Sequence, residues 1–109
     1  MTKSLNVEKG SGNVFADIGA PNAEEHFLKA HLVSRLEDLI KARKLTQVEA
    51  GRLLGLGQPD LSKILRGHFR DVSVSRLLRF LMALDCDVEI VLKRKRSAKR
   101  PSRLTIKAA

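Results

Sequence analysis

Two short amphipathic segments joined by a very short turn are the feature that most constrains the fold of this chain. Thr46 and Glu49 have the spacing of a capping box, which predicts that a helix begins there. This helix is expected to stop at the turn Gly55-Leu56-Gly57. A second helix follows at once from Gln58-Pro59-Asp60, where proline suits the first turn, and ends at Gly67. Residues 46–67 are therefore predicted to form two short helices packed closely around a turn.

Gly51 lies in the middle of the first of these helices. Glycine there costs about 1 kcal/mol relative to alanine in helix propensity. Its presence indicates that the next helix packs closely against this point. Such a pair is a helix-turn-helix unit, in which the second helix enters the major groove of DNA by its N-terminal residues.

The remaining elements are predicted from hydrophobic periodicity. A long first helix is expected from the N-cap Asn22, with Glu25 completing a capping box, to about residue 44. Ser73 caps a fourth helix, and the alternation over residues 87–93 predicts one strand. The side chains expected to face the core are Leu28, Leu32, Val33, Leu36, Leu39, Ile40, Ala50, Leu53, Leu54, Leu61, Ile64, Leu65, Val74, Leu77, Leu78, Leu81 and Leu84. The predicted fold is mainly α, with about four helices followed by one C-terminal β-strand.

The charge is unevenly distributed along the chain. The net charge is +9, but residues 93–109 carry eight basic and no acidic residues, whereas residues 23–92 carry eleven basic and ten acidic ones. We therefore expect an N-terminal extension over 1–22, a domain over 23–93 and a basic flexible tail over 94–109. Such a tail favours a nucleic-acid partner, although a solvated segment that aids solubility explains it as well.

Several functional classes find no support in the residues. The single cysteine, Cys86, cannot form an internal disulfide and fits a reducing, cytoplasmic compartment; we expect an inert buried thiol rather than a nucleophile. His26 and His31 lie on different helix faces, and His68 has no catalytic partner at a known spacing. No apolar stretch is long enough to span a membrane, and no nucleotide-binding fingerprint is present. The expectation is a protein that is not an enzyme and needs no cofactor or metal.

The first residues of the two short helices carry side chains suited to DNA. Gln47 opens the first helix, where its amide and nearby backbone N–H groups can reach a phosphate with help from the helix dipole. Gln58 opens the second, groove-entering helix, and a glutamine amide can pair with adenine through two hydrogen bonds. The alternatives are a solvent-facing Gln47 and a Gln58 that only caps its helix.

Further polar residues follow along the second helix. Ser62 can reach a base edge or a phosphate, and Lys63 suits a phosphate. Arg66 and Arg70 suit phosphates too, although both also fit ordinary surface charges. Asp60 can accept from cytosine, but a favourable charge at the helix N-terminus is the preferred interpretation. The predicted DNA-binding set is Thr46, Gln47, Gln58, Pro59, Ser62, Lys63, Arg66 and Arg70.

These motifs resemble a known family. Thr46-Gln47, Gly51, the run Gly55-Leu56-Gly57-Gln58, Leu61-Ser62 and Ile64 match the pattern of lambda-repressor-like, or Xre-type, domains over about residues 23–84. The run over residues 10–19 looks like HigA-type antitoxins, as do Gln58-Pro59, Leu65-Arg66-Gly67 and Asp87-Val88-Glu89-Ile90. The resemblance implies a lambda-repressor-like fold and an autorepressor that pairs with a toxin of the RelE/HigB ribonuclease superfamily.

The partners expected are double-stranded DNA with a palindromic operator, a second copy of the chain and a protein toxin. Val88, Ile90 and Leu92 would form the dimer interface by antiparallel strand pairing, or the strand would instead pair with residues 103–107 of its own chain. Residues 10–20 and the first helix are expected to hold the toxin. The alternatives are a plain Xre-type or phage-type repressor without a toxin, an RNA-associated basic module, and a helical protein-interaction domain.

Overall fold

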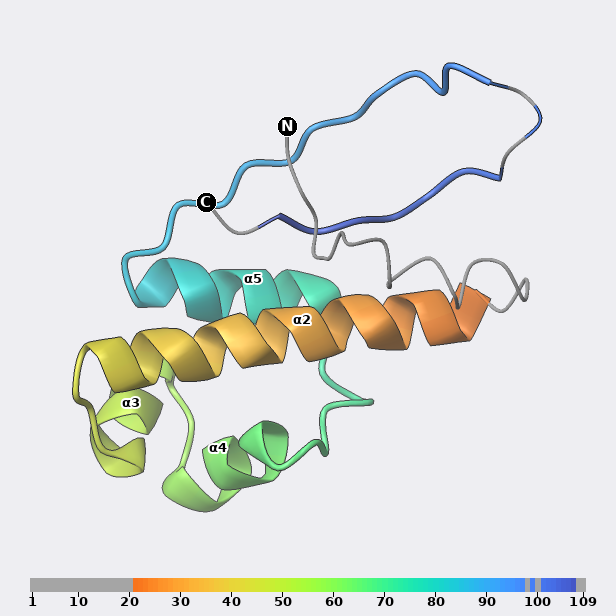
Figure 1. Ribbon diagram of the computed structural model, residues 1–109. Helices are drawn as coiled ribbons and strands as arrows, with labels where there is room; N and C mark the ends of the chain where they lie inside the picture. The colour runs from red at the N-terminus through yellow and green to blue at the C-terminus, as the bar shows by residue number, and fades with distance from the viewer. Residues whose placement is uncertain (1–20, 98, 100, 108–109) are drawn as a thin grey trace. The chain divides into compact units, whose positions relative to one another are not determined.

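A computed structural model describes residues 21–97, 99 and 101–107 of the 109 in the chain, so the expected N-terminal extension lies almost entirely outside the described residues. Four helices are present in the described part: α2 (Pro21–Ala42), α3 (Gln47–Leu54), α4 (Gln58–Leu65) and α5 (Val74–Ala83) (Figure 1). The chain divides into two units. One is Lys29–Glu89, and the other contains the start of α2 and the residues from Ile90 onward.

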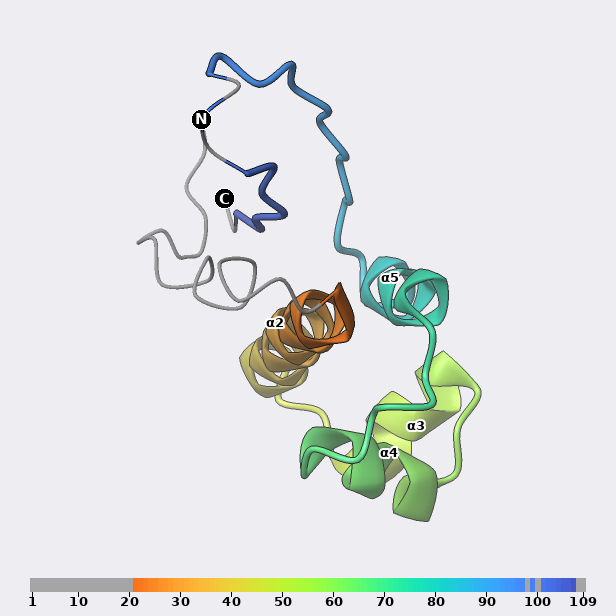
Figure 2. The same cartoon turned by 90° about the vertical axis from the view of Figure 1, so that its right-hand side faces the viewer.

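The unit Lys29–Glu89 contains the hydrophobic core. Within it α5 lies beside α2, and α3 and α4 lie together on one side of this pair (Figures 1 and 2). The largest fully buried side chains are Leu36 of α2, Leu61 of α4, Leu77 of α5 and Leu84, the C-cap of α5. Burial of a leucine side chain is worth about 1.5–3 kcal/mol, so these four residues contribute strongly to the packing of α2, α4 and α5. The other buried apolar residues are Leu32, Val33, Ile40, Ala50, Ile64, Phe69, Val72, Phe80 and Leu81.

Ten of the seventeen expected core residues are buried. The half-buried ones are Leu28, Leu39, Leu54, Leu65, Val74 and Leu78. Leu53, by contrast, is 48% exposed. The reason is the turning angle of about 100° per residue in an α-helix. Because α3 buries both Ala50 and Gly51, its inner face is centred between these two residues. Leu53 then points more than a quarter turn away from that centre. Phe69 and Phe80 occupy core positions that the apolar periodicity missed.

The helix ends follow local capping rules, with one correction. Helix α2 begins at Pro21, so Asn22 lies inside its first turn and is not the N-cap. Proline fits this first helical position because its ring fixes φ near the helical value. The cap at Ser73 is confirmed, since its side chain accepts from the backbone N–H of Arg76 at 3.1 Å.

The C-terminal ends of α2 and α5 use the same device. The residues after each helix, Lys44 at φ 56° and Asp85 at φ 63°, adopt the left-handed conformation that usually falls to glycine. This conformation lets the N–H of Cys86 donate to the Leu81 carbonyl at 3.1 Å. An ion pair of 3.6 Å between Arg43 and Asp85 links the two helix ends.

The predicted C-terminal strand is absent from the part of the chain that the structure describes. Residues 87–93 form neither a helix nor a strand, and neither do residues 103–107, so the alternative hairpin is also absent there. A strand is defined by its ladder of hydrogen bonds, and a single strand has no neighbour to bond with. The alternation of side chains was therefore insufficient to produce a strand within one chain.

Candidate nucleic-acid interface

The turn between α3 and α4 is built on close backbone contacts. Gly55 has φ 75°, and the N–H of Leu56 donates to the carbonyl of Gly51 at 2.8 Å, which ends α3. A Cβ atom added to Gly51 would lie 2.6 Å from the Leu56 carbonyl oxygen. Glycine is required at this position, as predicted, but the close neighbour is the turn and not the following helix.

The capping box at the start of α3 is confirmed. The backbone N–H of Glu49 donates to the Thr46 hydroxyl oxygen at 3.1 Å, and the backbone N–H of Thr46 donates to the Glu49 carboxylate at 2.8 Å. Hydrogen bonds to the carboxylate from the Thr46 backbone and then from the Thr46 side chain lower the pKa of Glu49, because they favour its charged form.

Gln47 and Gln58 are held together across the helix-turn-helix unit. The side-chain nitrogen Nε2 of Gln58 donates to the side-chain oxygen Oε1 of Gln47 at 2.7 Å. Each residue is the first of its helix, and Gln58 is exposed. The bond fixes the orientation of the Gln58 amide, which keeps its own Oε1 and its second N–H for another partner. The sequence placed both residues at helix starts but did not predict their contact.

The other predicted site residues on α4 share one face. Leu61 and Ile64 are buried, whereas Lys63 and Arg66 are exposed and Ser62 is half-buried. At about 100° per residue, Ser62, Lys63 and Arg66 lie on the side of the helix away from the two buried residues. Pro59, Asp60 and Arg70 are exposed as well. Helix α4 therefore presents a polar and basic face, while its apolar face packs into the core.

Lys29 is a residue that the sequence analysis missed. Its side chain is only 6% exposed, and its Nζ donates to the backbone carbonyl of Arg70 at 2.8 Å. This bond joins α2 to the segment that follows α4, and so it helps to position Arg70. One signal was available, because Lys29 lies three and seven residues before the buried Leu32 and Leu36 and so shares their helix face.

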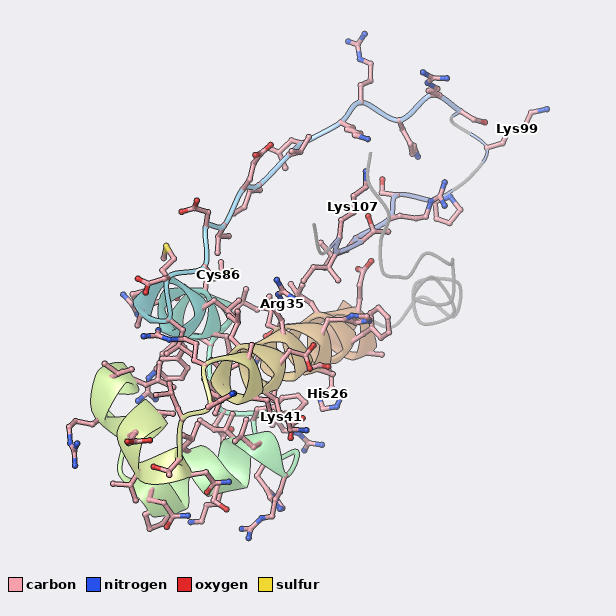
Figure 3. All side chains as sticks on the ribbon, turned by 60° about the vertical axis from the view of Figure 1, so that its left-hand side comes forward. His26, Arg35, Lys41, Cys86, Lys99 and Lys107 are labelled. Carbon is pink, nitrogen blue, oxygen red and sulfur yellow. The ribbon has the colours of Figure 1, made fainter. Side chains whose placement is uncertain are left out.

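Cys86 lies just after α5, where Figure 3 shows its sulfur. The thiol is half-buried and not buried as predicted, because α5 has already ended and Cys86 borders a shallow hollow with Met82. No group of three His, Cys, Asp or Glu side chains among the described residues is placed to hold a metal ion. None of the helices described is long and apolar enough to cross a membrane.

Comparison with known proteins agrees with this geometry. Residues 14–93 match the family described as a helix-turn-helix domain, so the chain belongs to the helix-turn-helix family, a class of DNA-binding domains. A solved structure described as belonging to the XRE family of transcriptional regulators is 37% identical, with a TM-score of 0.77. The similarity covers 82% of this chain and 100% of that one. No curated protein matches. The Xre-type resemblance is thus confirmed, whereas its narrower form, the HigA-type antitoxin, stays a prediction.

Proposed function

We propose that this protein is a transcriptional regulator that binds a specific duplex DNA sequence and reads it with Gln58. The observation that carries the proposal is the 2.7 Å hydrogen bond between Gln58 and Gln47. Base recognition by glutamine requires that the amide present its oxygen and nitrogen in a defined order. The bond to Gln47 sets this order before DNA arrives, which reduces the conformational entropy lost on binding.

The free groups of Gln58 match the major-groove edge of adenine. Adenine offers an amino group that donates at N6 and a nitrogen that accepts at N7. The free Oε1 of Gln58 would accept from N6, and the second N–H on Nε2 would donate to N7. The Nε2 group of Gln47 and the hydroxyl of Thr46 would donate to a neighbouring phosphate. The basic residues Lys63, Arg66 and Arg70, with Pro59 and Ser62 beside them, would hold the flanking backbone.

Two substitutions separate base reading from backbone binding. Gln58→Ala is expected to weaken operator binding by about 1–3 kcal/mol and to leave random DNA little affected, because it removes a bidentate base contact. Lys63→Ala is expected to weaken both and to flatten the salt dependence. The operator is first selected from a random duplex pool with the full chain. Equal losses on operator and random duplex for Gln58→Ala would rule out base reading.

A double-mutant cycle tests whether Gln47 acts through Gln58. Gln47→Ala, Gln58→Ala and the double variant are compared for operator binding. If Gln47 orients Gln58, the double variant loses less affinity than the sum of the two single losses, by at least about 0.5 kcal/mol. Additive losses would mean that Gln47 contacts only the phosphate.

We propose further that the protein acts as a homodimer through residues 88–92. Ile90 is 72% exposed and Leu92 is 91% exposed, which is costly for large apolar side chains, while Val88 is half-buried. A second copy running antiparallel would supply the missing ladder partner. Two recognition helices about 34 Å apart would then read a palindromic operator.

Ile90→Pro tests the dimer by light scattering, because proline removes a backbone donor and fixes φ. Ser97→Pro, outside the proposed strand, is the matched control. The expected result is a monomer for the first variant and a dimer for the second. A dimer of undiminished stability with Ile90→Pro would exclude this contact.

An antitoxin role is a second candidate function, supported by the likeness of residues 10–19 and 87–90 to HigA-type antitoxins. The partner would be a small basic protein of the RelE/HigB type encoded beside this chain. Co-purification with the product of the neighbouring gene tests the role. Deletion of residues 1–20 is expected to reduce toxin binding and to spare DNA binding. Unchanged affinity for the toxin after this deletion would contradict the role assigned to these residues.

A further inference from the structure

The C-terminal segment, residues 93–109, carries most of the excess positive charge of the chain. Residues 93–109 hold eight basic and no acidic residues. Within this segment, the cations that the structure describes as exposed are Lys93, Arg94, Lys95, Arg96, Lys99 and Arg103. Figure 3 shows the side chain of Lys99 projecting away from the path of the backbone. The net charge of the whole chain is +9, and this excess must be balanced by mobile counterions or by an anionic partner.

This segment is additional to the family fold. The match to the helix-turn-helix domain ends at residue 93, where the basic run begins. By contrast, residues 23–92 are close to neutral, with eleven basic and ten acidic residues. The net charge of residues 23–92 therefore adds little attraction for DNA beyond the basic face of α4, and the role of the tail does not follow from the family match.

We propose that residues 93–107 are a second DNA-binding element, which holds the phosphate backbone of duplex DNA without reading its sequence. This inference rests on the proposed function and adds the source of its non-specific affinity. The described residues of the segment form neither a helix nor a strand, so the backbone can adapt to a partner.

The segment has four arginines but no aromatic side chain, and it is the lack of aromatic side chains that favours duplex DNA over RNA. Proteins that read single-stranded RNA stack its bases on aromatic side chains or on guanidinium groups, and aromatic platforms are the common device. Residues 93–109 contain no Phe, Tyr or Trp. A dense row of lysine and arginine instead suits a continuous row of phosphates, where each contact releases a condensed counterion.

The experiment measures the salt dependence of binding to a short random duplex by fluorescence anisotropy. The full chain is compared with the variant K93Q/R94Q/K95Q/R96Q. Each phosphate contact contributes about 0.9 to the slope of log affinity against log salt, so the loss of two to four contacts lowers the slope by about 2–4. Between about 50 and 200 mM salt, the affinity of the full chain should then fall about 15–150-fold more than that of the variant.

Two controls make the outcome specific. The variant R94K/R96K/R103K keeps the charge and is expected to keep the slope. Gln58→Ala is expected to lose operator preference with the slope on random duplex unchanged, so a failure of sequence reading is distinguished from a failure of the tail. An unchanged slope in the glutamine variant would overturn the proposal. A variant that loses affinity for structured RNA but not for duplex DNA would also overturn it and assign the tail to RNA.

Discussion

Replacing Gly51 by alanine sets two effects of known sign against each other. Alanine is favoured over glycine inside a helix by about 1 kcal/mol, so an exposed position in α3 would gain that much. At Gly51 the new Cβ would lie 2.6 Å from the carbonyl oxygen of Leu56. This oxygen belongs to the backbone of the turn and not to a flexible side chain, so the turn itself must move by about half an ångström.

The steric cost of the added Cβ is expected to exceed the gain in helix propensity. Forcing an extra carbon into a close-packed site costs about 1–3 kcal/mol, and the upper part of that range applies here because a backbone atom must shift. After subtraction of the gain in helix propensity, Gly51→Ala should lower the free energy of unfolding by about 1–2 kcal/mol. For a domain of this size the melting temperature falls by about 4–16 °C.

Thermal unfolding followed by circular dichroism measures this change. The control is the pair Arg79→Ala and Arg79→Gly, at an exposed position in the middle of α5, which calibrates the difference in propensity without a clash. The alanine variant at residue 79 is expected to be the more stable of that pair by about 1 kcal/mol. If Gly51→Ala melts at or above the temperature of the natural protein, the close contact does not constrain the turn and the reasoning fails.

Three further outcomes are expected. Lys44→Gly should raise the free energy of unfolding by up to about 1 kcal/mol in urea titrations, because φ 56° is strained for any residue with a Cβ; a less stable variant would contradict this. The lowered pKa of Glu49 stabilises the fold above about pH 4.5, its ordinary value, and this contribution is lost as the pH falls. Glu49→Gln should therefore make the free energy of unfolding less dependent on pH in the acid range. An unchanged pH dependence would contradict the capping role of the Glu49 carboxylate. Lys29→Met should destabilise by about 1–3 kcal/mol because the Arg70 carbonyl loses a charged donor, whereas the exposed Lys41→Met should change little; equal effects would refute the buried bond.

The parts of the fold that were predictable from the sequence depend on neighbours along the chain. The starts at Thr46 and Ser73 and the stop at Gly55 are each set by bonds to residues three or four positions away. A capping box or a left-handed glycine can be recognised in the sequence because the residues that it bonds to lie at a fixed spacing. The first turn of α4 was placed correctly for a different reason, because Pro59 suits a first helical turn, whereas the N-cap Gly57 makes no side-chain cap hydrogen bond.

The parts that were not predictable depend on groups far apart in the sequence. Lys29 bonds to a carbonyl 41 residues away, and a backbone carbonyl has no sequence signature. The contact between Gln47 and Gln58 requires the angle between two helices, which periodicity does not supply. The prediction of a strand over residues 87–93 was wrong for a related reason, since alternating side chains define a face but do not supply the neighbouring strand.

Stability and recognition meet at the turn between α3 and α4. One residue, Gly57, separates Leu56, whose carbonyl lies against Gly51, from Gln58, whose amide bonds to Gln47. A hydrogen bond of 2.7 Å lies at the short end of the usual range of about 2.7–3.2 Å, so a displacement of about half an ångström brings it to the long end of that range. A shift of the turn that relieves a clash at Gly51 therefore also disturbs the orientation of the amide proposed to read a base. The close approach at Gly51 thus serves both the packing of the unit and its proposed specificity, whereas the basic segment after residue 93 contributes attraction that this turn does not influence.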